Sequence, residues 1–360
     1  MEAITERIFT ETSLDSASND DPSLLTIILD VSPIGWYNLR NQVTLRDVTK
    51  SLLVFLNSHL SINNSNQVAF IASSPYRSKF LYPNPNATSK SSNISKGMYR
   101  QFKNVDDVVL SELNKFIEIT SKKLQDDSKG KKHLSSTITG AISLALTYTN
   151  RMLTLDQSIS TTTASAITTS STLNPTNQIN SSSSTTAQST ASMKSRVLIV
   201  SANDNDDSLN YIPLMNCIFT AQKLKVSIDI LKLGNKDSSY LQQASDATNG
   251  IYLKIIDPNG IIQILSTAFF IEPNLRPYVI LPTDTQVNYK ASCFLTKKPV
   301  DLGYVCSICL CIMSYIPSEN KCPACSSEFD SKIVQQLTKD PQIIINKKKR
   351  KLDNSVKEVG

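Results

Sequence analysis

The sequence has little histidine, glycine and tryptophan: its 360 residues include only two His, nine Gly and one Trp. With two His, a His-based catalytic metal centre is nearly excluded and a catalytic triad that needs a His is disfavoured. The glycine-rich and serine-centred motifs Gly-x4-Gly-Lys-Ser/Thr, Gly-x-Gly-x-x-Gly and Gly-x-Ser-x-Gly do not occur. We therefore assign no catalytic and no cofactor-binding residues from these motifs.

Long apolar runs are also missing. No stretch reaches the roughly 18 consecutive apolar residues that a membrane-spanning helix needs, so we predict no membrane contact. The first residues are acidic and lack an apolar segment, so we expect no secretory signal. The seven Cys are odd in number and mostly clustered, which favours a reducing compartment and metal binding over disulfides.

The net charge of +6 is concentrated in one place. Five of the six charges lie in the run Lys347–Lys351, which leaves +1 for the rest of the chain. The folded part is therefore not globally basic, and its charge does not indicate a nucleic-acid-binding surface. The run is interpreted as a nuclear-import signal, with a DNA contact and a solvated tail as the alternatives.

Apolar segments of strand and helix type alternate along the first three quarters of the chain. This order predicts right-handed crossovers and a doubly wound, mostly parallel α/β sheet with helices on both faces, over residues 21–272. The predicted strands are 24–29, 67–73, 79–82, 196–201, 226–233 and 251–255, and the predicted helices are 44–60, 104–120, 135–151, 210–224, 239–248 and 260–270. We expect His59, at a helix end, to be a surface residue or a capping residue.

Residues 158–192 interrupt this alternation, because 21 of these 35 residues are Ser or Thr. Such a tract cannot bury enough apolar surface to offset its ordering entropy, so a disordered insertion is predicted. The remaining boundaries are an N-terminal tail over 1–20, a linker over 273–300, a Cys-rich module over 301–335 and a basic tail over 336–360.

Two Cys-x2-Cys pairs, Cys306/Cys309 and Cys322/Cys325, are separated by twelve residues. This spacing is typical of a tetrahedral four-cysteine zinc site, in which the closed ligand shell makes the metal structural. We predict one zinc ion there. Cys311 is an alternative ligand to Cys309, and Cys293 is a spare thiol. A two-zinc ubiquitin-ligase module would need eight ligands, whereas this segment offers six Cys and no His.

Asp30 and Ser32 follow the first predicted strand, at the sheet edge where α/β proteins bind ligands. With Thr137 and Asp204 they could form part of an oxygen cage for Mg²⁺. Ile34 stands where a second Ser would complete the cage, and a hard cation demands near-complete oxygen coordination. We therefore expect no Mg²⁺ at Asp30 and Ser32, whose side chains would instead cap local turns.

Trp36 and Tyr37 come just after this loop. They are candidate aromatic anchors for a protein partner, and the alternative for Trp36 is a partly buried position at the rim.

The order of an Asp30-Val-Ser-Pro-Ile-Gly-Trp36 segment, a late Val197-Leu-Ile-Val-Ser-Ala202 strand and a four-cysteine module resembles one family in particular. This is the smaller von Willebrand A-type subunit of the transcription and repair factor TFIIH, the transcription factor B subunit 4 family of fungi. The likeness covers about residues 23–335, apart from the Ser/Thr insertion and the loop after Tyr82. Its most specific segments are 215–223, 241–246, 250–254, 287–293 and 303–309.

The resemblance implies a von Willebrand A-like domain followed by a small four-cysteine zinc module. It also implies a non-catalytic structural subunit of the TFIIH core, acting in RNA polymerase II transcription initiation and nucleotide-excision repair. The expected partners are other TFIIH core subunits, chiefly the larger A-type subunit through its zinc module, with any DNA contact indirect. The expected location is the nucleus. The competing hypotheses are a metal-dependent, ligand-binding A-domain protein and a zinc-module ubiquitin ligase.

Overall fold

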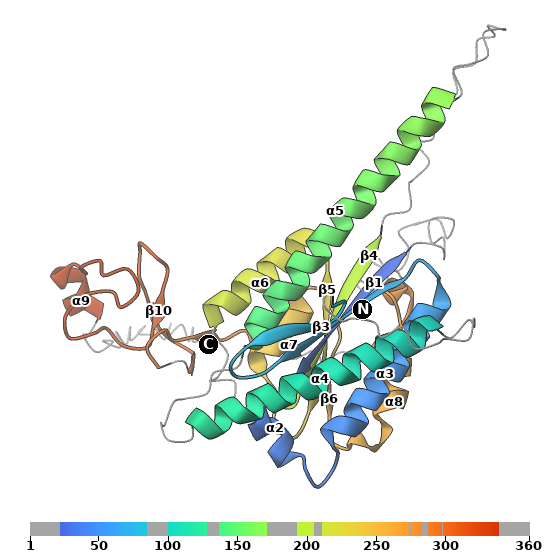
Figure 1. The fold of residues 1–360 in the computed structure, drawn as a ribbon. Helices are drawn as coiled ribbons and strands as arrows, with labels where there is room; N and C mark the ends of the chain where they lie inside the picture. The colour runs from blue at the N-terminus through green and yellow to red at the C-terminus, as the bar shows by residue number, and fades with distance from the viewer. Residues whose placement is uncertain are drawn as a thin grey trace, which may run out of the picture. The chain divides into compact units, whose positions relative to one another are not determined.

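The chain divides into two compact units, Met1–Lys290 and Ala291–Gly360. A computed structural model (Figure 1) describes a defined part of them. The described residues are 22–84, 100–127, 137–170, 193–204, 211–273, 275–282, 287–296 and 298–337.

A six-stranded sheet forms the centre of the first unit, in the order β3-β2-β1-β4-β5-β6. All neighbouring strands are parallel except β2 and β3, which are antiparallel with a bulge between Phe70 and Ile71. Each strand predicted from the sequence is present. The strands are β1 (Ser23–Asp30), β2 (Gln67–Ser73), β3 (Ser78–Tyr82), β4 (Lys194–Ser201), β5 (Ser227–Leu233) and β6 (Tyr252–Ile255).

Helices cover both faces of this sheet (Figure 1). One face is covered by α3 (Leu45–Ile62), α4 (Arg100–Asp127), α8 (Ile261–Ile264) and the π-helical turn η5 (Leu265–Phe269). The other face is covered by α5 (Ile138–Ser170), α6 (Tyr211–Leu224) and α7 (Ser239–Ala247). The described residues of this unit also form α2 (Pro33–Asn38) and the 3-10 turns η4 (Pro258–Gly260) and η6 (Arg276–Tyr278). Within the described part of the chain, no helix has the length and apolar character needed to cross a membrane.

Two apolar layers result from the alternation of side chains along the central strands. In β1, Leu25, Ile27 and Leu29 belong to the layer under α3 and α4, whereas Ile28 belongs to the layer under α5, α6 and α7. All eight residues of β1 are buried, because this strand has neighbours on both edges and helices on both faces. The predicted doubly wound, mostly parallel α/β fold with helices on both faces is thereby confirmed.

The predicted start of the disordered insertion at Ser158 is wrong. The helix α5 continues to Ser170, thirteen residues into the Ser/Thr-rich tract. Once a helix is nucleated, each added residue gains a backbone hydrogen bond, so a well-packed N-terminal half can carry residues of poor helix propensity. Residues 171–192, the predicted N-terminal tail 1–20 and most of the predicted basic tail lie outside the described residues.

The predicted linker, residues 273–300, is divided between the two units. Its first half belongs to the α/β unit, where the Arg276 guanidinium bonds both carboxylate oxygens of Asp229 at 2.8 and 2.6 Å. Its second half belongs to the cysteine unit, where the Phe294 N–H donates to the Ile312 carbonyl. Neither set of contacts could be read from composition, because each joins residues that are distant in the sequence.

The surface position predicted for His59 is also wrong. This residue lies in the last turn of α3, and its side chain is fully buried. Its Nε2 atom is 3.2 Å from the Ser23 hydroxyl at the start of β1. Burial lowers the pKa of His59 to about 4.

The described part of the second unit contains two small hairpins and one helix. The elements are β7 (Ala291–Ser292) with β8 (Pro299–Val300), β9 (Tyr304–Val305) with β10 (Ile312–Met313), and α9 (Ser331–Leu337). Its buried apolar cluster consists of three cysteines and one methionine, with Leu295 and Phe329 packed against them.

Candidate metal centre and surface groove

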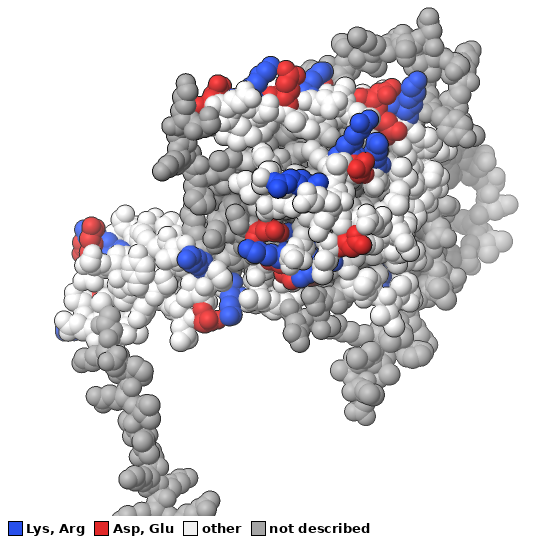
Figure 2. Space-filling model, turned by 90° about the horizontal axis from the view of Figure 1, so that it is seen from below, with Lys and Arg blue, Asp and Glu red and all other residues white. Residues whose placement is uncertain are grey.

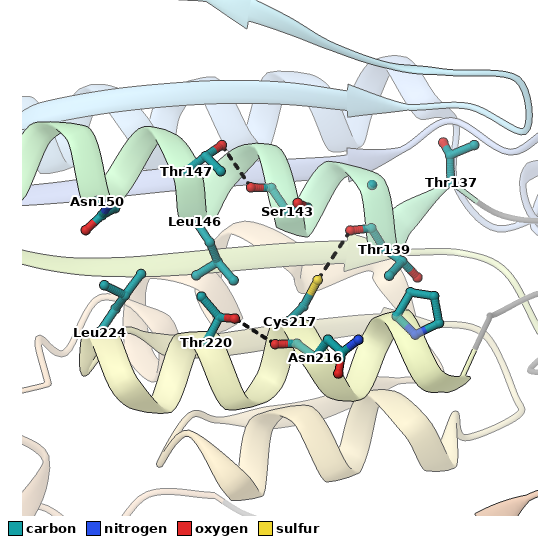
Figure 3. Close-up of a pocket in the computed structure, with 12 residues that line it drawn as sticks. Thr137, Thr139, Ser143, Leu146, Thr147, Asn150, Asn216, Cys217, Thr220 and Leu224 are labelled. Carbon is teal, nitrogen blue, oxygen red and sulfur yellow. Dashed lines mark hydrogen bonds between the residues drawn. The ribbon is translucent and has the colours of Figure 1, made fainter. Parts of the chain in front are cut away.

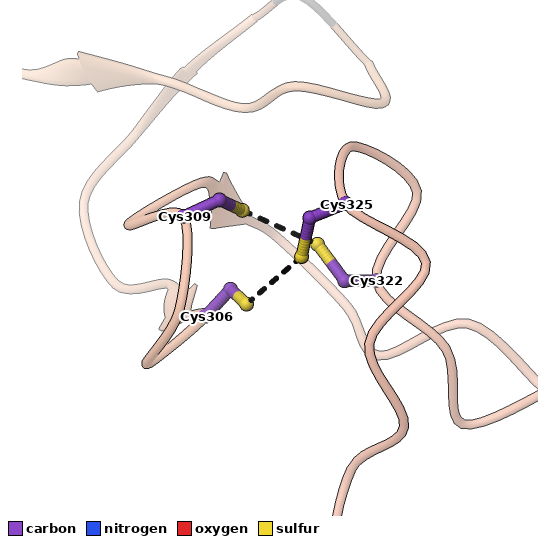
Figure 4. A group of neighbouring side chains, drawn as sticks. All are labelled: Cys306, Cys309, Cys322 and Cys325. Atoms are coloured by element: carbon purple, nitrogen blue, oxygen red, sulfur yellow. Dashed lines mark hydrogen bonds between the residues drawn. The ribbon is translucent and has the colours of Figure 1, made fainter.

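The four cysteines of the two Cys-x2-Cys pairs come together in the second unit (Figure 4), with all four sulfur atoms within 4.8 Å of one another. The Sγ atoms of Cys306 and Cys325 are 3.8 Å apart, and those of Cys309 and Cys322 are 3.5 Å apart. A tetrahedral zinc with Zn–S bonds of about 2.3 Å holds its sulfur ligands about 3.8 Å apart. These residues therefore fit a zinc ion, and the spacing is far too long for a disulfide.

Both pairs lie in tight loops with the same hydrogen bonds. In the first loop, the Cys306 N–H donates to the Cys311 carbonyl over 3.0 Å, and the Leu310 N–H donates to the Cys306 carbonyl over 2.9 Å. The second loop repeats both bonds from Cys322, at 2.9 Å each. Leu310 and Ser326, the matching fifth residues, both have a left-handed backbone with φ of 57° and 59°. The local sequence thus presents each pair of sulfur atoms on one side of its loop.

Hydrogen bonds favour the ionised form of two of these thiols. The backbone N–H of Cys309, followed by the Ser327 hydroxyl, lowers the pKa of Cys306 to about 6. The Ser327 hydroxyl also lowers the pKa of Cys325. Because the thiolate is the form that binds metals, these contacts prepare the cluster for a cation.

The two remaining cysteines of this unit lie outside the four-sulfur group. The Cys311 sulfur is directed to the Ile312 carbonyl, 4.0 Å away, so the geometry favours Cys309 over Cys311 as the ligand. Cys293 is buried, and its sulfur accepts the N–H groups of Thr296 at 3.5 Å and Ser314 at 3.2 Å.

The oxygen-bearing residues after the strands of the first unit are engaged within the chain. Asp30 is buried, and its Oδ1 atom accepts the Ser32 N–H at 3.0 Å, which is the local turn expected as the alternative to metal binding. Its Oδ2 atom accepts the Ser201 hydroxyl at 3.4 Å. Burial raises the pKa of Asp30 to about 7. Thr137 donates its hydroxyl to the Ser74 carbonyl.

Ile34 and Asp204 are the remaining two residues of the possible Mg²⁺ cage at this edge of the sheet. Ile34 is half exposed and offers no oxygen. Asp204 accepts a hydrogen bond of 2.8 Å from the ammonium group of Lys232, a residue of β5. The cage for Mg²⁺ is therefore incomplete, and a lysine ammonium occupies one of its carboxylates. The sequence did not predict a role for Lys232, because a Lys in an apolar strand does not indicate that it pairs with an Asp 28 residues away.

The two aromatic residues after this loop differ in how far they are exposed. Trp36 is only partly exposed, packs against the core, and donates its indole N–H to the Asp30 carbonyl at 2.7 Å. The hypothesis that Trp36 is an exposed anchor is therefore wrong, and the alternative of a partly buried residue is confirmed. Tyr37 is 66% exposed, with the Arg40 guanidinium 4.1 Å above its ring.

A groove of about 720 Å³ runs between α5 and α6 (Figure 3). Its α5 wall carries short side chains at one-turn spacing, at Gly140, Ser143 and Thr147. Such side chains lie on one face of a helix and leave the space between two helices unfilled. The α6 wall contributes Pro213, Asn216, Cys217, Thr220 and Leu224.

Large apolar side chains stand exposed on the same helix. Phe219 is 63% exposed and Ile212 is 49% exposed. They are seven residues apart and so lie on one side of α6, two turns from each other. The sequence marked α6 only as a helix, and the groove could not be foreseen because it depends on how α5 and α6 pack.

Comparison with known proteins gives a consistent result. The family model described as transcription factor Tfb4 matches residues 22–326. A Debaryomyces hansenii protein named general transcription and DNA repair factor IIH subunit TFB4 is 57% identical, with 99% of this chain and 97% of that protein covered. The Saccharomyces cerevisiae protein of the same name is 37% identical, with 98% and 99% covered.

A solved structure shares the fold of the first unit. The crystal structure of the TFIIH p34 N-terminal domain is 30% identical, with a TM-score of 0.50 and coverage of 69% of this chain and 98% of that domain. The family model spans the α/β unit and the cysteine loops together, and the relatives match along nearly their whole length. The chain therefore belongs to the Tfb4 family of transcription factors.

Proposed function

We propose that this chain is a non-catalytic structural subunit of the TFIIH core, acting in the nucleus in RNA polymerase II transcription initiation and nucleotide-excision repair. The observation that carries this proposal is the family match over residues 22–326, which includes both units. Relatives that match over nearly their entire length are named as subunits of the general transcription and DNA repair factor IIH.

Two features of the described residues support a structural role. The strand-end carboxylates Asp30 and Asp204 are bound by the chain's own N–H, hydroxyl and ammonium groups. The cysteine cluster offers four sulfur ligands, which close a tetrahedral shell and leave no position for a reacting water. Both features oppose the hypothesis of a metal-dependent ligand-binding domain.

In the second unit, Cys306, Cys309, Cys322 and Cys325 would hold one structural zinc ion. The support is the match between the observed sulfur separations and tetrahedral zinc coordination. When bound, the ion contributes folding free energy to a unit that has a very small apolar core. One such group among the described residues is also fewer than the two that a two-zinc ubiquitin-ligase module requires.

The partner assigned to the α/β unit is the zinc module of the larger A-type subunit, and we place it in the groove between α5 and α6. The groove is lined mainly by short polar side chains, and α6 also exposes Phe219 and Ile212, which lie outside the lining on another side of the helix. Stable protein interfaces have this composition, with an apolar anchor surrounded by polar contacts. The residues that line the groove include no carboxylate that could hold a bridging metal ion, so the proposed contact is a direct one between side chains.

Contact with DNA would be indirect. On the face shown in Figure 2, acidic and basic side chains are interspersed rather than gathered by sign. A surface that binds the phosphate backbone instead needs a continuous basic patch. The basic run Lys347–Lys351 lies outside the described residues, and we assign it to nuclear import.

The groove is tested by reconstituting the TFIIH core with variants of the full chain. Replacing Ser143 and Thr220 together by Arg fills the groove from both walls, and we expect binding of the larger A-type subunit to fall at least tenfold. Ser111→Arg is the matched control, because Ser111 is exposed on α4, on the other face of the sheet. Both proteins should have wild-type melting temperatures.

Unchanged binding by the double variant would refute the groove as the docking surface. If no TFIIH subunit copurifies with the wild-type chain, the proposed function itself is refuted. Binding should also be the same with and without added Mg²⁺.

A further inference from the structure

Lys232 is a lysine with no exposed surface, at the carboxyl end of β5. In the sheet register it lies beside Ser201, the last residue of β4. Burying an ammonium group is costly unless it is paired and hydrogen-bonded, so a lysine in this position requires dedicated partners.

Those partners come from two sources. The Nζ atom donates to Asp204 Oδ1 at 2.8 Å and to the Leu233 carbonyl at 2.8 Å. Asp30, the last residue of β1, is not among these partners: its carboxylate accepts the Ser201 hydroxyl at 3.4 Å, and burial raises its pKa to about 7. The ammonium group thus joins the end of β5 to Asp204, which follows β4.

The backbone allows Asp204 to approach closely. Gly234 has a φ of +112°, and a Cβ atom at this position would lie 3.0 Å from Asp204 Oδ1. A side chain there would be strained and would crowd the carboxylate. The glycine therefore keeps open the space in which Asp204 meets Lys232.

We propose that the Lys232 ammonium is a built-in cation at the carboxyl ends of β4 and β5, where it pairs with Asp204 in place of a divalent metal. The ammonium supplies positive charge and N–H donors without the near-complete oxygen cage that Mg²⁺ requires and that Ile34 interrupts. This inference concerns the folding of the domain and holds whether or not the groove binds the proposed partner.

The test is thermal unfolding of the full chain with and without millimolar MgCl₂. Lys232→Met keeps the apolar stem and removes the charge, and we expect the melting temperature of the α/β unit to fall by about 10 °C, because the partly buried carboxylate of Asp204 loses its partner. Lys254→Met is the matched control. Lys254 also pairs with an Asp, but at the surface of β6, so its loss should shift the melting temperature by about 1 °C or less.

Mg²⁺ should leave the melting temperature of the wild type unchanged, and calorimetric titration of the wild type with Mg²⁺ should give no binding heat. A wild type that binds or is stabilised by Mg²⁺ would overturn the proposal, as would a Lys232→Met variant as stable as the wild type.

If Lys232→Met does not fold, Asp204→Asn decides the matter, because Asp204 is partly exposed and easier to replace. It should lower the melting temperature by several degrees without a response to Mg²⁺. No change in its melting temperature would count against the proposal.

Discussion

The two units of this chain bury very different amounts of apolar surface. In the first, strands with all residues buried are covered by helices on both faces, so two continuous apolar layers stabilise the fold. Among the described residues of the second, the buried cluster consists of Cys306, Cys311, Met313 and Cys322. Hydrophobic burial can stabilise the first unit, whereas a unit with a core as small as that of the second usually requires a bound metal or a disulfide.

The sharpest test of this contrast is Cys322→Ser. The variant should lose its zinc and unfold the second unit, since structural zinc contributes about 10–16 kcal/mol to such modules. The α/β unit should keep its thermal transition. Elemental analysis and limited proteolysis measure the two effects.

Cys217→Ser on α6 is the control, because Cys217 is half-buried far from any other cysteine in the sequence. It should retain one zinc per chain. A wild type with two zinc ions or with none would show that the four-cysteine assignment is wrong.

A second test asks whether burial alone stabilises the first unit. Arg276→Met breaks the two-bonded pair with Asp229 and leaves a buried carboxylate without its partner. We expect the free energy of unfolding to fall by about 3–5 kcal/mol. Urea denaturation measures it, and a loss below about 1 kcal/mol would mean that residues after 272 are not part of this unit.

The third test uses pH. The folded pKa of His59 is about 4, below its ordinary value of 6.5, because the side chain is buried. Between these values the unfolded chain binds the proton and the folded chain does not, so stability is full above pH 6.5 and declines as the pH falls to 4. The shift corresponds to about 3 kcal/mol.

His59→Gln should flatten this acid dependence in the α/β unit, which urea denaturation at pH 7, 5.5 and 4.5 would show. An equal slope in variant and wild type would assign the acid sensitivity to other groups.

The smallest effect is expected from removing residues 158–192. The flanks of this segment already meet, because the Met193 N–H donates to Asp156 Oδ2 at 2.9 Å. Joining them by a short Gly/Ser linker should change the melting temperature by about 2 °C or less, since loop entropy varies slowly with length. A drop of many degrees would show that this segment contributes to the core.

Local patterns carried most of what the sequence could predict. The strands were recognisable because their residues are buried on both faces and read as apolar runs. The four cysteines that could hold a metal ion were recognisable because each pair lies within one tight loop. In contrast, His59 meets Ser23, and Lys232 meets Asp204, only through the tertiary fold.

Composition did not predict the end of α5 or the division of the linker, because both depend on contacts with neighbouring structure. The Ser/Thr-rich residues 158–170 are helical because the packed start of α5 precedes them. The linker was divided because Arg276 finds Asp229 on β5, a contact that spans 47 residues. A single sequence contains the residues of such pairs but gives no measure of their proximity.

The edges of the sheet limit how this protein can be recognised. At one edge, β3 is five residues long, lies beside a bulge, and carries Lys79, which is paired with Glu112 of α4. At the other edge, β6 has four residues and carries Lys254, which is paired with Asp237.

Short, bulged and charged edge strands resist the addition of a foreign strand. At these two edges, addition of a strand from a partner or from a second copy is therefore disfavoured. Assembly then depends on side chains displayed by helices and loops, so single substitutions can weaken one contact of the complex and leave the others intact.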